Sequence, residues 1–164
     1  MQGEDCLEEK TNVMRLLEQK KIKYTSHCYK DTDAISGTEV ASVLNQDENR
    51  VFKTLVTVGK SKNYYVFVIP VNRELDLKKA AKSVGEKSIE MLKSKELLPL
   101  TGYVHGGCSP IGQKKFFKTT FHKTCEDYET ICFSAGKIGY QVEVNVKDLT
   151  KIIRYQISDI VIDK

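Results

Sequence analysis

The sequence predicts an α+β fold, with a mixed, strongly curved, barrel-like β-sheet flanked by helices. Strand-like segments outnumber helical ones, and they follow one another in hairpins instead of alternating regularly with helices. Three of the predicted helices have capping residues of their own. No repeat, low-complexity tract or linker interrupts the 164 residues, so residues 1–164 are expected to form a single domain.

The first elements are predicted by apolar periodicity and by turn residues. Apolar residues at helical spacing predict a helix over residues 5–20, and a short strand is expected over residues 22–29. The stretch SGTE, residues 36–39, is a capping box, in which two side chains satisfy backbone donors at the start of a helix. Two runs rich in β-branched and aromatic residues, 51–58 and 64–70, flank a glycine-containing connection and therefore predict an antiparallel hairpin.

The later elements follow the same signals. Asp76 is the predicted cap of a helix that Gly85 ends, and Asp148 is the predicted cap of the last helix. Proline cannot continue the hydrogen bonds of a helix, so Pro99 is expected to end a short helix that begins at Ser94. Further strands are expected over residues 89–92, 116–121, 130–134, 140–146 and 155–161.

The composition excludes several classes of protein. With 40% apolar and 29% charged residues the chain has an ordinary globular composition, and its longest apolar run, residues 64–71, is far too short to span a bilayer. The acidic amino terminus lacks the apolar segment of a signal peptide. Five cysteines without tight spacing indicate reduced thiols rather than a disulfide framework. We therefore expect a cytoplasmic protein with neither membrane nor DNA among its partners.

Lys53 is the first residue that could carry chemistry. It shares one face of the predicted strand with Val51 and Leu55, and the other face is apolar too, which is typical of a strand buried on both sides. Burying an unpaired ammonium group costs several kcal/mol. Two interpretations follow: an edge lysine that extends to water, or a cation in a pocket where a carbonyl or phosphate oxygen binds.

The segment VHGGCSPIGQKK, residues 104–115, is the second candidate. Its glycines, among them Gly106 and Gly107, allow the backbone to approach a ligand closely. The segment has neither the phosphate-loop pattern nor the nucleophile-elbow pattern. His105 and Cys108 are close in sequence, but no acidic residue is nearby to orient the histidine. We interpret the segment as a loop that cradles a ligand with backbone N–H groups and the Ser109 hydroxyl.

Three weaker patterns remain open from the residues alone. His122, Cys125 and Cys132 could supply three zinc ligands, but structural zinc sites prefer paired ligands, so no metal is expected. Lysines between positions 114 and 123 could contact RNA or form a solvated face, and the net charge of +4 is mild. Taken alone, the segment SAGKIG, residues 134–139, is typical of a hairpin turn.

Four segments in this order resemble one family. They are VFKTL (51–55), LDLKKA (75–80), TGYVHGGCSPIGQKK (101–115) and SAGKIG (134–139). Together they are similar to the YbaK/EbsC family of free-standing aminoacyl-tRNA editing domains, which resemble the insertion domain of bacterial prolyl-tRNA synthetases. The glycine-rich motif is the specific one, and the resemblance runs from the first helix to Ile160.

The resemblance implies a fold, an activity and partners. It implies a barrel-like mixed sheet with flanking helices in a single editing domain over residues 1–164. Members of the family hydrolyse tRNA that carries the wrong amino acid, and this branch resembles the deacylases acting on Cys-tRNA(Pro) and Cys-tRNA(Cys). The implied partners are the acceptor end of aminoacyl-tRNA and prolyl-tRNA synthetase, and no cofactor is implied.

The resemblance also assigns roles to individual residues. Lys53 matches the essential lysine of the family, and Thr54 follows it. Tyr29 matches a tyrosine of the substrate pocket. Close relatives have an acidic residue where this chain has Gln141. The residues that match the loop around the aminoacyl–adenosine end are Gly106, Gly107 and Ser109, and those that match the opposing wall are Ser134 and Gly136.

These roles imply an enzyme that brings no nucleophile of its own. An aminoacyl ester is already activated, so positioning and charge stabilisation suffice for its cleavage. Water or the substrate's own side chain would attack, which makes the enzyme a hydrolase, or a lyase if a cyclic thioester is the product. Other classes stay open: a non-catalytic module that binds aminoacyl-tRNA or a synthetase, a thiol- or zinc-dependent hydrolase, and a deacylase for another amino acid such as alanine.

Overall fold

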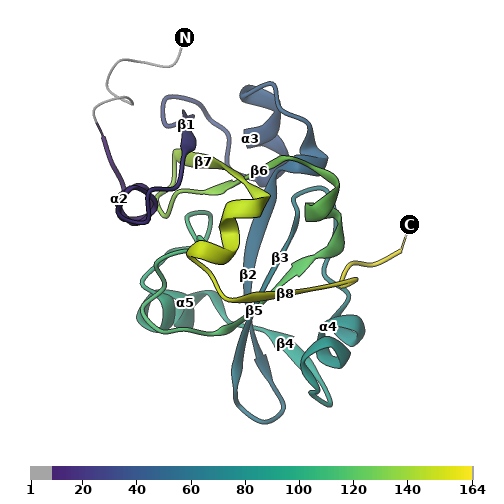
Figure 1. Ribbon diagram of the computed structural model, residues 1–164. Helices are drawn as coiled ribbons and strands as arrows, with labels where there is room; N and C mark the ends of the chain where they lie inside the picture. Colours follow the sequence, from purple (N-terminus) through teal and green to yellow (C-terminus); the bar gives the residue numbers. More distant parts are fainter. Residues whose placement is uncertain (1–8, 164) are drawn as a thin grey trace.

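The computed structural model describes residues 9–163 and has the predicted α+β character. Its strands form two sheets (Figure 1), a smaller one in the order β1–β7–β6 and a larger one in the order β4–β2–β3–β5–β8. The strands are β1 (Tyr24–Cys28), β2 (Phe52–Gly59), β3 (Tyr64–Pro70), β4 (Ile89–Met91), β5 (Lys118–His122), β6 (Thr130–Ser134), β7 (Tyr140–Asn145) and β8 (Tyr155–Ser158).

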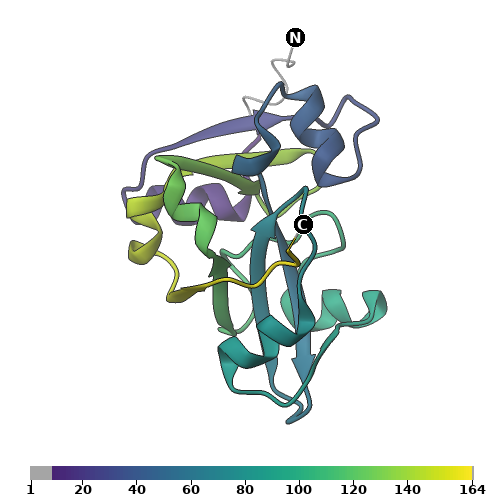
Figure 2. The same ribbon diagram turned by 90° about the vertical axis from the view of Figure 1, so that its right-hand side faces the viewer.

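The predicted barrel is not confirmed. The two sheets meet at an isolated bridge between Val51 and Cys132, directly before β2 begins. From there β2 pairs with β3 along its whole length and with β4 at its far end. Figure 2 shows the β2–β3 hairpin extending away from the smaller sheet. The ladder between the sheets therefore stops after one bridge, and the sheet does not close.

Two of the helices begin at their predicted caps, whereas the first helix begins at Asn12, so its prediction over residues 9–11 is wrong. The Thr11 hydroxyl caps α2 (Asn12–Gln19), and the part of this helix predicted before residue 9 lies outside the described residues. The capping box of Ser36 and Glu39 is confirmed at α3 (Gly37–Val43). The Asp76 carboxylate accepts two backbone N–H groups at the start of α4 (Leu77–Val84). Within residues 9–163 no helix has the length and apolar character needed to cross a membrane.

Two of the predicted helix signals are wrong. Pro99 does not end α5 (Ser94–Thr101), because the turn after it is held by a bond from the Gly102 N–H to the Leu98 carbonyl. Asp148 does not begin an α-helix: residues Val146–Lys151 form a 3₁₀ helix, capped by the Asn145 side chain. A local signal sets the position of each turn, but the packing around it decides whether the helix continues.

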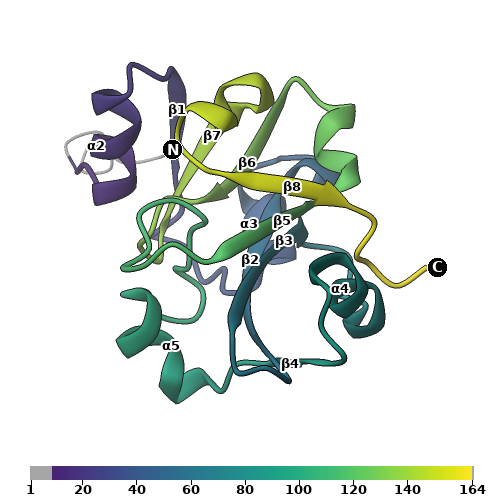
Figure 3. The same ribbon diagram turned by 60° about the horizontal axis from the view of Figure 1, so that its bottom comes forward.

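The strand β3 lies between two apolar cores. Val66 and Val68 pack into the larger core, together with α2 and the smaller sheet, whereas Phe67 and Ile69 pack into a second core under α4. Alternate residues of a strand point to opposite faces, so both faces of β3 are covered, as its apolar sequence predicts. Figure 3 shows α4 and α5 on opposite sides of the β2–β3 hairpin.

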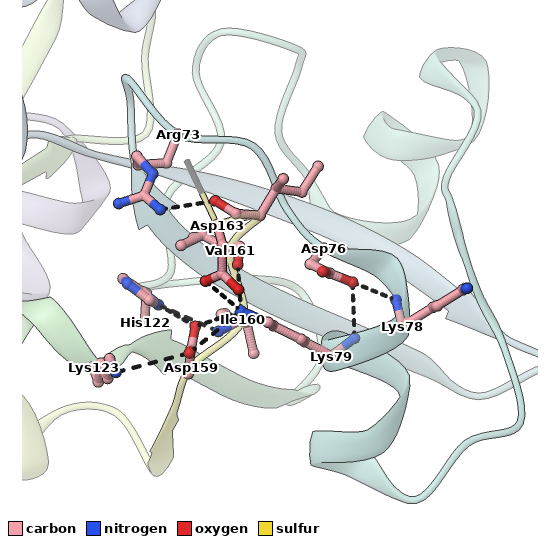
Figure 4. Close-up of polar contacts among 11 residues, drawn as sticks. Arg73, Asp76, Lys78, Lys79, His122, Lys123, Asp159, Ile160, Val161 and Asp163 are labelled. Carbon is pink, nitrogen blue, oxygen red and sulfur yellow. Dashed lines mark hydrogen bonds and ion pairs between the residues drawn. The ribbon is translucent and has the colours of Figure 1, made fainter.

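The carboxyl-terminal segment is held by polar contacts (Figure 4). The Lys79 ammonium donates to the Val161 carbonyl at 2.9 Å and contacts the Asp159 and Asp163 carboxylates at 3.3 and 2.9 Å. Nδ1 of the buried His122 accepts the Ile160 N–H at 3.3 Å. Burial lowers the pKa of His122, which keeps the ring neutral and able to accept this bond. These contacts fix the segment after β8 against α4 and β5.

The cysteines differ from the prediction in one position. Cys108, Cys125 and Cys132 are free and buried, as expected of reduced thiols. Cys28 is disulfide-bonded, so the prediction that all five cysteines are reduced is wrong there. Cys6 lies outside the described residues.

Candidate functional site

A pocket of about 440 Å³ lies where the two sheets meet. Its walls come from β2, from the start of α3, from the glycine-rich loop and from the ends of β6 and β7. Five of the eight predicted site residues line this pocket: Tyr29, Lys53, Thr54, Gly106 and Ser134. Segments from across the whole sequence therefore converge on a single pocket, most of whose lining is apolar.

Lys53 is the one residue with a formal charge among the described residues that line the pocket. It stands opposite Ile69 in the β2–β3 ladder and is half-buried. Burial lowers the pKa of Lys53, and the carboxylate of Glu74 opposes this shift at longer range. Within residues 9–163, no hydrogen bond or ion pair is formed by its ammonium group. Lys53 is thus a half-buried cation that lines the pocket and has no hydrogen-bonded partner among residues 9–163.

Tyr29 and Thr54 also line the pocket. The Tyr29 N–H donates to the Gly139 carbonyl at 2.8 Å, which fixes the end of β1 against the turn between β6 and β7. The hydroxyl oxygen of Thr54 is buried and has no hydrogen-bond partner within the described part of the chain. Buried polar groups are rarely left unpaired, and those that are often mark a functional site.

The glycine-rich loop divides into residues that line the pocket and residues that shape the loop. Gly106 lines the pocket with a φ of +88°, a conformation that favours glycine. Gly107 and Ser109 are not among the residues that line it. The Ser109 hydroxyl is buried and accepts the Ile111 N–H at 3.3 Å, so it stabilises the loop from within. For the Ser109 hydroxyl to contact a ligand, as predicted, the loop would have to change its conformation.

The wall opposite this loop, at residues 134–136, also contains one residue that lines the pocket and one that shapes the turn. Ser134 lines the pocket, and its hydroxyl accepts the Gly136 N–H at 3.0 Å. Gly136 itself does not line the pocket; its φ is +91°, and a Cβ there would lie 2.9 Å from Cγ2 of Val13. Gly136 therefore supports the wall by allowing the turn to pack against α2.

The pocket has no nucleophile with an adjacent base. Cys108 lines it, but burial raises the pKa of its thiol to about 12, so the thiol is neutral at pH 7. His105 also lines the pocket and is exposed. No carboxylate occurs among the described lining residues, so none is available to orient the histidine. These observations agree with the interpretation of the loop as a cradle.

One contact made by a pocket residue could not be predicted from the sequence. The Gln46 and Gln141 side-chain amides exchange two hydrogen bonds, of 2.7 and 3.1 Å, and Gln141 lines the pocket. Gln46 lies in a polar turn after α3, where nothing in the sequence distinguishes it from its neighbours. The three candidate zinc ligands, His122, Cys125 and Cys132, do not form a cluster within residues 9–163. Cys132 lies beside His27 and Glu143 instead, and His122 contacts the segment after β8.

Comparisons with known proteins bear on this site. A family model described as "Aminoacyl-tRNA editing domain" matches residues 32–152. The Enterococcus faecalis protein EbsC, which is named as a Cys-tRNA(Pro)/Cys-tRNA(Cys) deacylase, is 44% identical over 154 residues, covering 93% of this chain and 94% of EbsC. A proline–tRNA ligase of Thermosipho africanus is 30% identical over 77 residues, which are 47% of this chain and 14% of the ligase.

The fold has solved counterparts. A crystal structure described as a trans-editing enzyme for prolyl tRNA synthetase superposes with a TM-score of 0.79 at 21% identity. The superposition covers 94% of this chain and 100% of the chain in that crystal structure. At this identity the likeness concerns the fold.

Proposed function

Because the chain belongs to the aminoacyl-tRNA editing domain family, we propose that it is a trans-editing deacylase that cleaves the aminoacyl ester of Cys-tRNA(Pro) and of Cys-tRNA(Cys). It acts in the cytoplasm, as a single editing domain over residues 1–164. The 44% identity to EbsC over nearly the whole of both chains supports this substrate class.

Lys53 is the observation that carries the proposal. A half-buried cation without a hydrogen-bonded partner, in a mostly apolar pocket, will bind an anion or a polarised oxygen. In an aminoacyl-tRNA the ester carbonyl and the phosphates of the terminal adenosine are such groups. Lys53 would orient the ester and stabilise the negative charge that develops on its carbonyl oxygen. Tyr29, Thr54, Gly106 and Ser134 would surround the cysteinyl group.

The pocket favours attack by the substrate's own thiol. None of its described lining residues is a carboxylate that could activate water. A cysteine thiol with a pKa of about 8.5 is a few per cent thiolate at neutral pH, and thiolates are strong nucleophiles. The thiolate attacks its own carbonyl carbon, the ester C–O bond breaks, and the ribose oxygen takes up a proton. The amino acid leaves as a cyclic thioester, which water then hydrolyses to cysteine.

This mechanism predicts a strong dependence on the thiol of the substrate. Single-turnover deacylation of Cys-tRNA(Pro) should be at least about tenfold faster than that of Ser-tRNA(Pro), because serine has nearly the same size but its hydroxyl stays protonated. S-methylated Cys-tRNA(Pro) should be slower as well, since its sulfur has no proton to lose. Equal rates for all three substrates would show that water attacks directly.

The same assay distinguishes the other candidate functions. A non-catalytic module would bind Cys-tRNA(Pro) without increasing its rate of deacylation. A deacylase for another amino acid would prefer Ala-tRNA(Pro) in a panel that also contains the prolyl and seryl forms. The proposed function requires turnover with a preference for the cysteinyl form.

The tRNA body is expected to contribute little to binding by the isolated protein. The exposed lysines Lys114, Lys115 and Lys118 offer only a few phosphate contacts. Binding that depends on few such contacts is weak and falls as salt rises. We therefore expect weak binding of Cys-tRNA(Pro) at physiological salt in a filter-binding titration, and the affinity should fall as the salt concentration rises.

Prolyl-tRNA synthetase is the proposed source of selectivity for tRNA(Pro). Adding the synthetase should raise the affinity for Cys-tRNA(Pro) but not the affinity for the same acyl group on an unrelated tRNA. Tight binding selective for tRNA(Pro) by the isolated protein would contradict this proposal.

A further inference from the structure

We propose that His27, Cys132 and Glu143 form a binding site for a divalent transition-metal ion, most suited to Zn²⁺, outside the substrate pocket. A ring nitrogen of His27, Sγ of Cys132 and a carboxylate oxygen of Glu143 all lie within 4.8 Å of one another. None of these three residues lines the pocket. The sequence did not suggest this set, because its members are far apart along the chain.

The smaller sheet brings the three ligands together. Cys132 of β6 stands directly opposite Glu143 of β7, and on the other side Glu143 stands opposite Thr25 of β1. His27 lies two residues after Thr25 and so points to the same face of the sheet. Each of the three strands therefore contributes one ligand to one face, at neighbouring positions.

The contacts within the cluster position the ligand atoms. Nε2 of His27 lies 2.9 Å from Oε1 of Glu143. The other carboxylate oxygen, Oε2, accepts a bond of 2.6 Å from the Thr130 hydroxyl and lies 3.6 Å from the Arg50 guanidinium. Outer contacts of this kind hold a ligating carboxylate in orientation. Oε1 and Nε2 thus face each other across the position where a metal ion would replace a shared proton.

The chemistry of the three donors selects the ion. Thiolate and imidazole bind Zn²⁺ well and are poor ligands for Mg²⁺ and Ca²⁺. With bonds of about 2.0–2.3 Å, Zn²⁺ would draw the donor atoms closer together. The side chains of His27 and Glu143 are 23% and 28% exposed, which leaves them room to move and leaves a fourth position for water. A bound divalent ion deprotonates a coordinating thiol, so the buried neutral thiol of Cys132 is no obstacle.

Cobalt is the first probe of the proposed site. Chelator-treated protein, full chain and without tRNA, is titrated with Co²⁺, whose thiolate complexes absorb by charge transfer. We expect this absorption to saturate at one equivalent, to disappear on addition of Zn²⁺, and to be absent from Cys132→Ser. Its absence from the wild-type protein, or its persistence in Cys132→Ser, would overturn the proposal.

Matched variants test the other two ligands. Losing even an outer partner of a metal ligand lowers affinity about 10–100-fold, so His27→Gln and Glu143→Gln should each weaken Zn²⁺ binding at least about tenfold in a calorimetric titration. Cys125→Ser, which removes a free buried thiol outside the cluster, should bind Zn²⁺ as the wild type does. If Cys132→Ser fails to fold, the two partly exposed residues decide the question. Unchanged affinity in both of their variants would reject the site.

Discussion

Replacing Lys53 by alanine is expected to lower kcat/KM for deacylation of Cys-tRNA(Pro) by about 10²–10³-fold, the loss found when one preorganised group that stabilises an oxyanion is removed. Among the described residues that line the pocket, Lys53 is the one with a formal charge, so no neighbour can take over its role. The variant should fold normally, because removing the Lys53 ammonium group removes the desolvation penalty of a buried charge and breaks no hydrogen bond.

Lys60→Ala is the matched control for this experiment. Lys60 is exposed in the turn between β2 and β3, away from the pocket. The Lys60→Ala variant should keep the wild-type kcat/KM. Its melting temperature, measured by circular dichroism, should equal that of Lys53→Ala. If Lys53→Ala keeps more than half of the wild-type kcat/KM, charge stabilisation by Lys53 is not part of the reaction.

Gly139→Ala is expected to lower the free energy of unfolding by about 2–5 kcal/mol, the sum of a strained backbone and a steric clash. Gly139 has a φ of +99°, and a Cβ at this position would lie 2.7 Å from Cβ and 3.0 Å from Cα of Lys30. Its carbonyl accepts the N–H of Tyr29, so separating the two segments would also displace a residue of the pocket. Such displacement should reduce kcat/KM at least about tenfold.

Gly85→Ala separates the two contributions. Gly85 also has a positive φ, of +74°, but nothing lies within 4 Å of a Cβ placed there. Its alanine variant should therefore lose only the backbone contribution, about 1–2 kcal/mol, and should keep full deacylase activity. Both values come from urea unfolding curves. Equal losses in the two variants would show that the turn moves away from Lys30 without cost.

The sequence predicts those parts of the fold that depend on neighbouring residues. The capping box at Ser36 and the cap at Asp76 are confirmed because each involves residues within one turn of a helix. The hairpins β2–β3 and β6–β7 are confirmed because their connections are short. Pro99 and Asp148 are the exceptions among these local signals: the backbone bond from Gly102 to Leu98 continues α5 past Pro99, and the residues around Asp148 form a 3₁₀ helix.

What depends on distant parts of the chain could not be predicted from the sequence. The apolar sequence of β2 marks Lys53 as unusual, but only the fold shows that it lines a pocket. Ser109 belongs to the most specific motif, yet its hydroxyl turns into the loop. The pairing of Gln46 with Gln141, and the cluster of Cys132 with His27, depend on strand pairings that no local pattern encodes.

The position of β8 has a consequence for the order in which the protein folds. β8 pairs in parallel with β5, which in turn pairs in parallel with β3, so the larger sheet is completed by residues near the carboxyl end of the chain. Parallel pairings between distant segments form slowly, because the entropy cost of closing a long loop comes before any stabilising contact is made. During synthesis, β5 has an unpaired edge until β8 leaves the ribosome, and an unpaired edge is a site of aggregation. A chain whose synthesis stops before residue 155 would therefore keep this edge of β5 exposed.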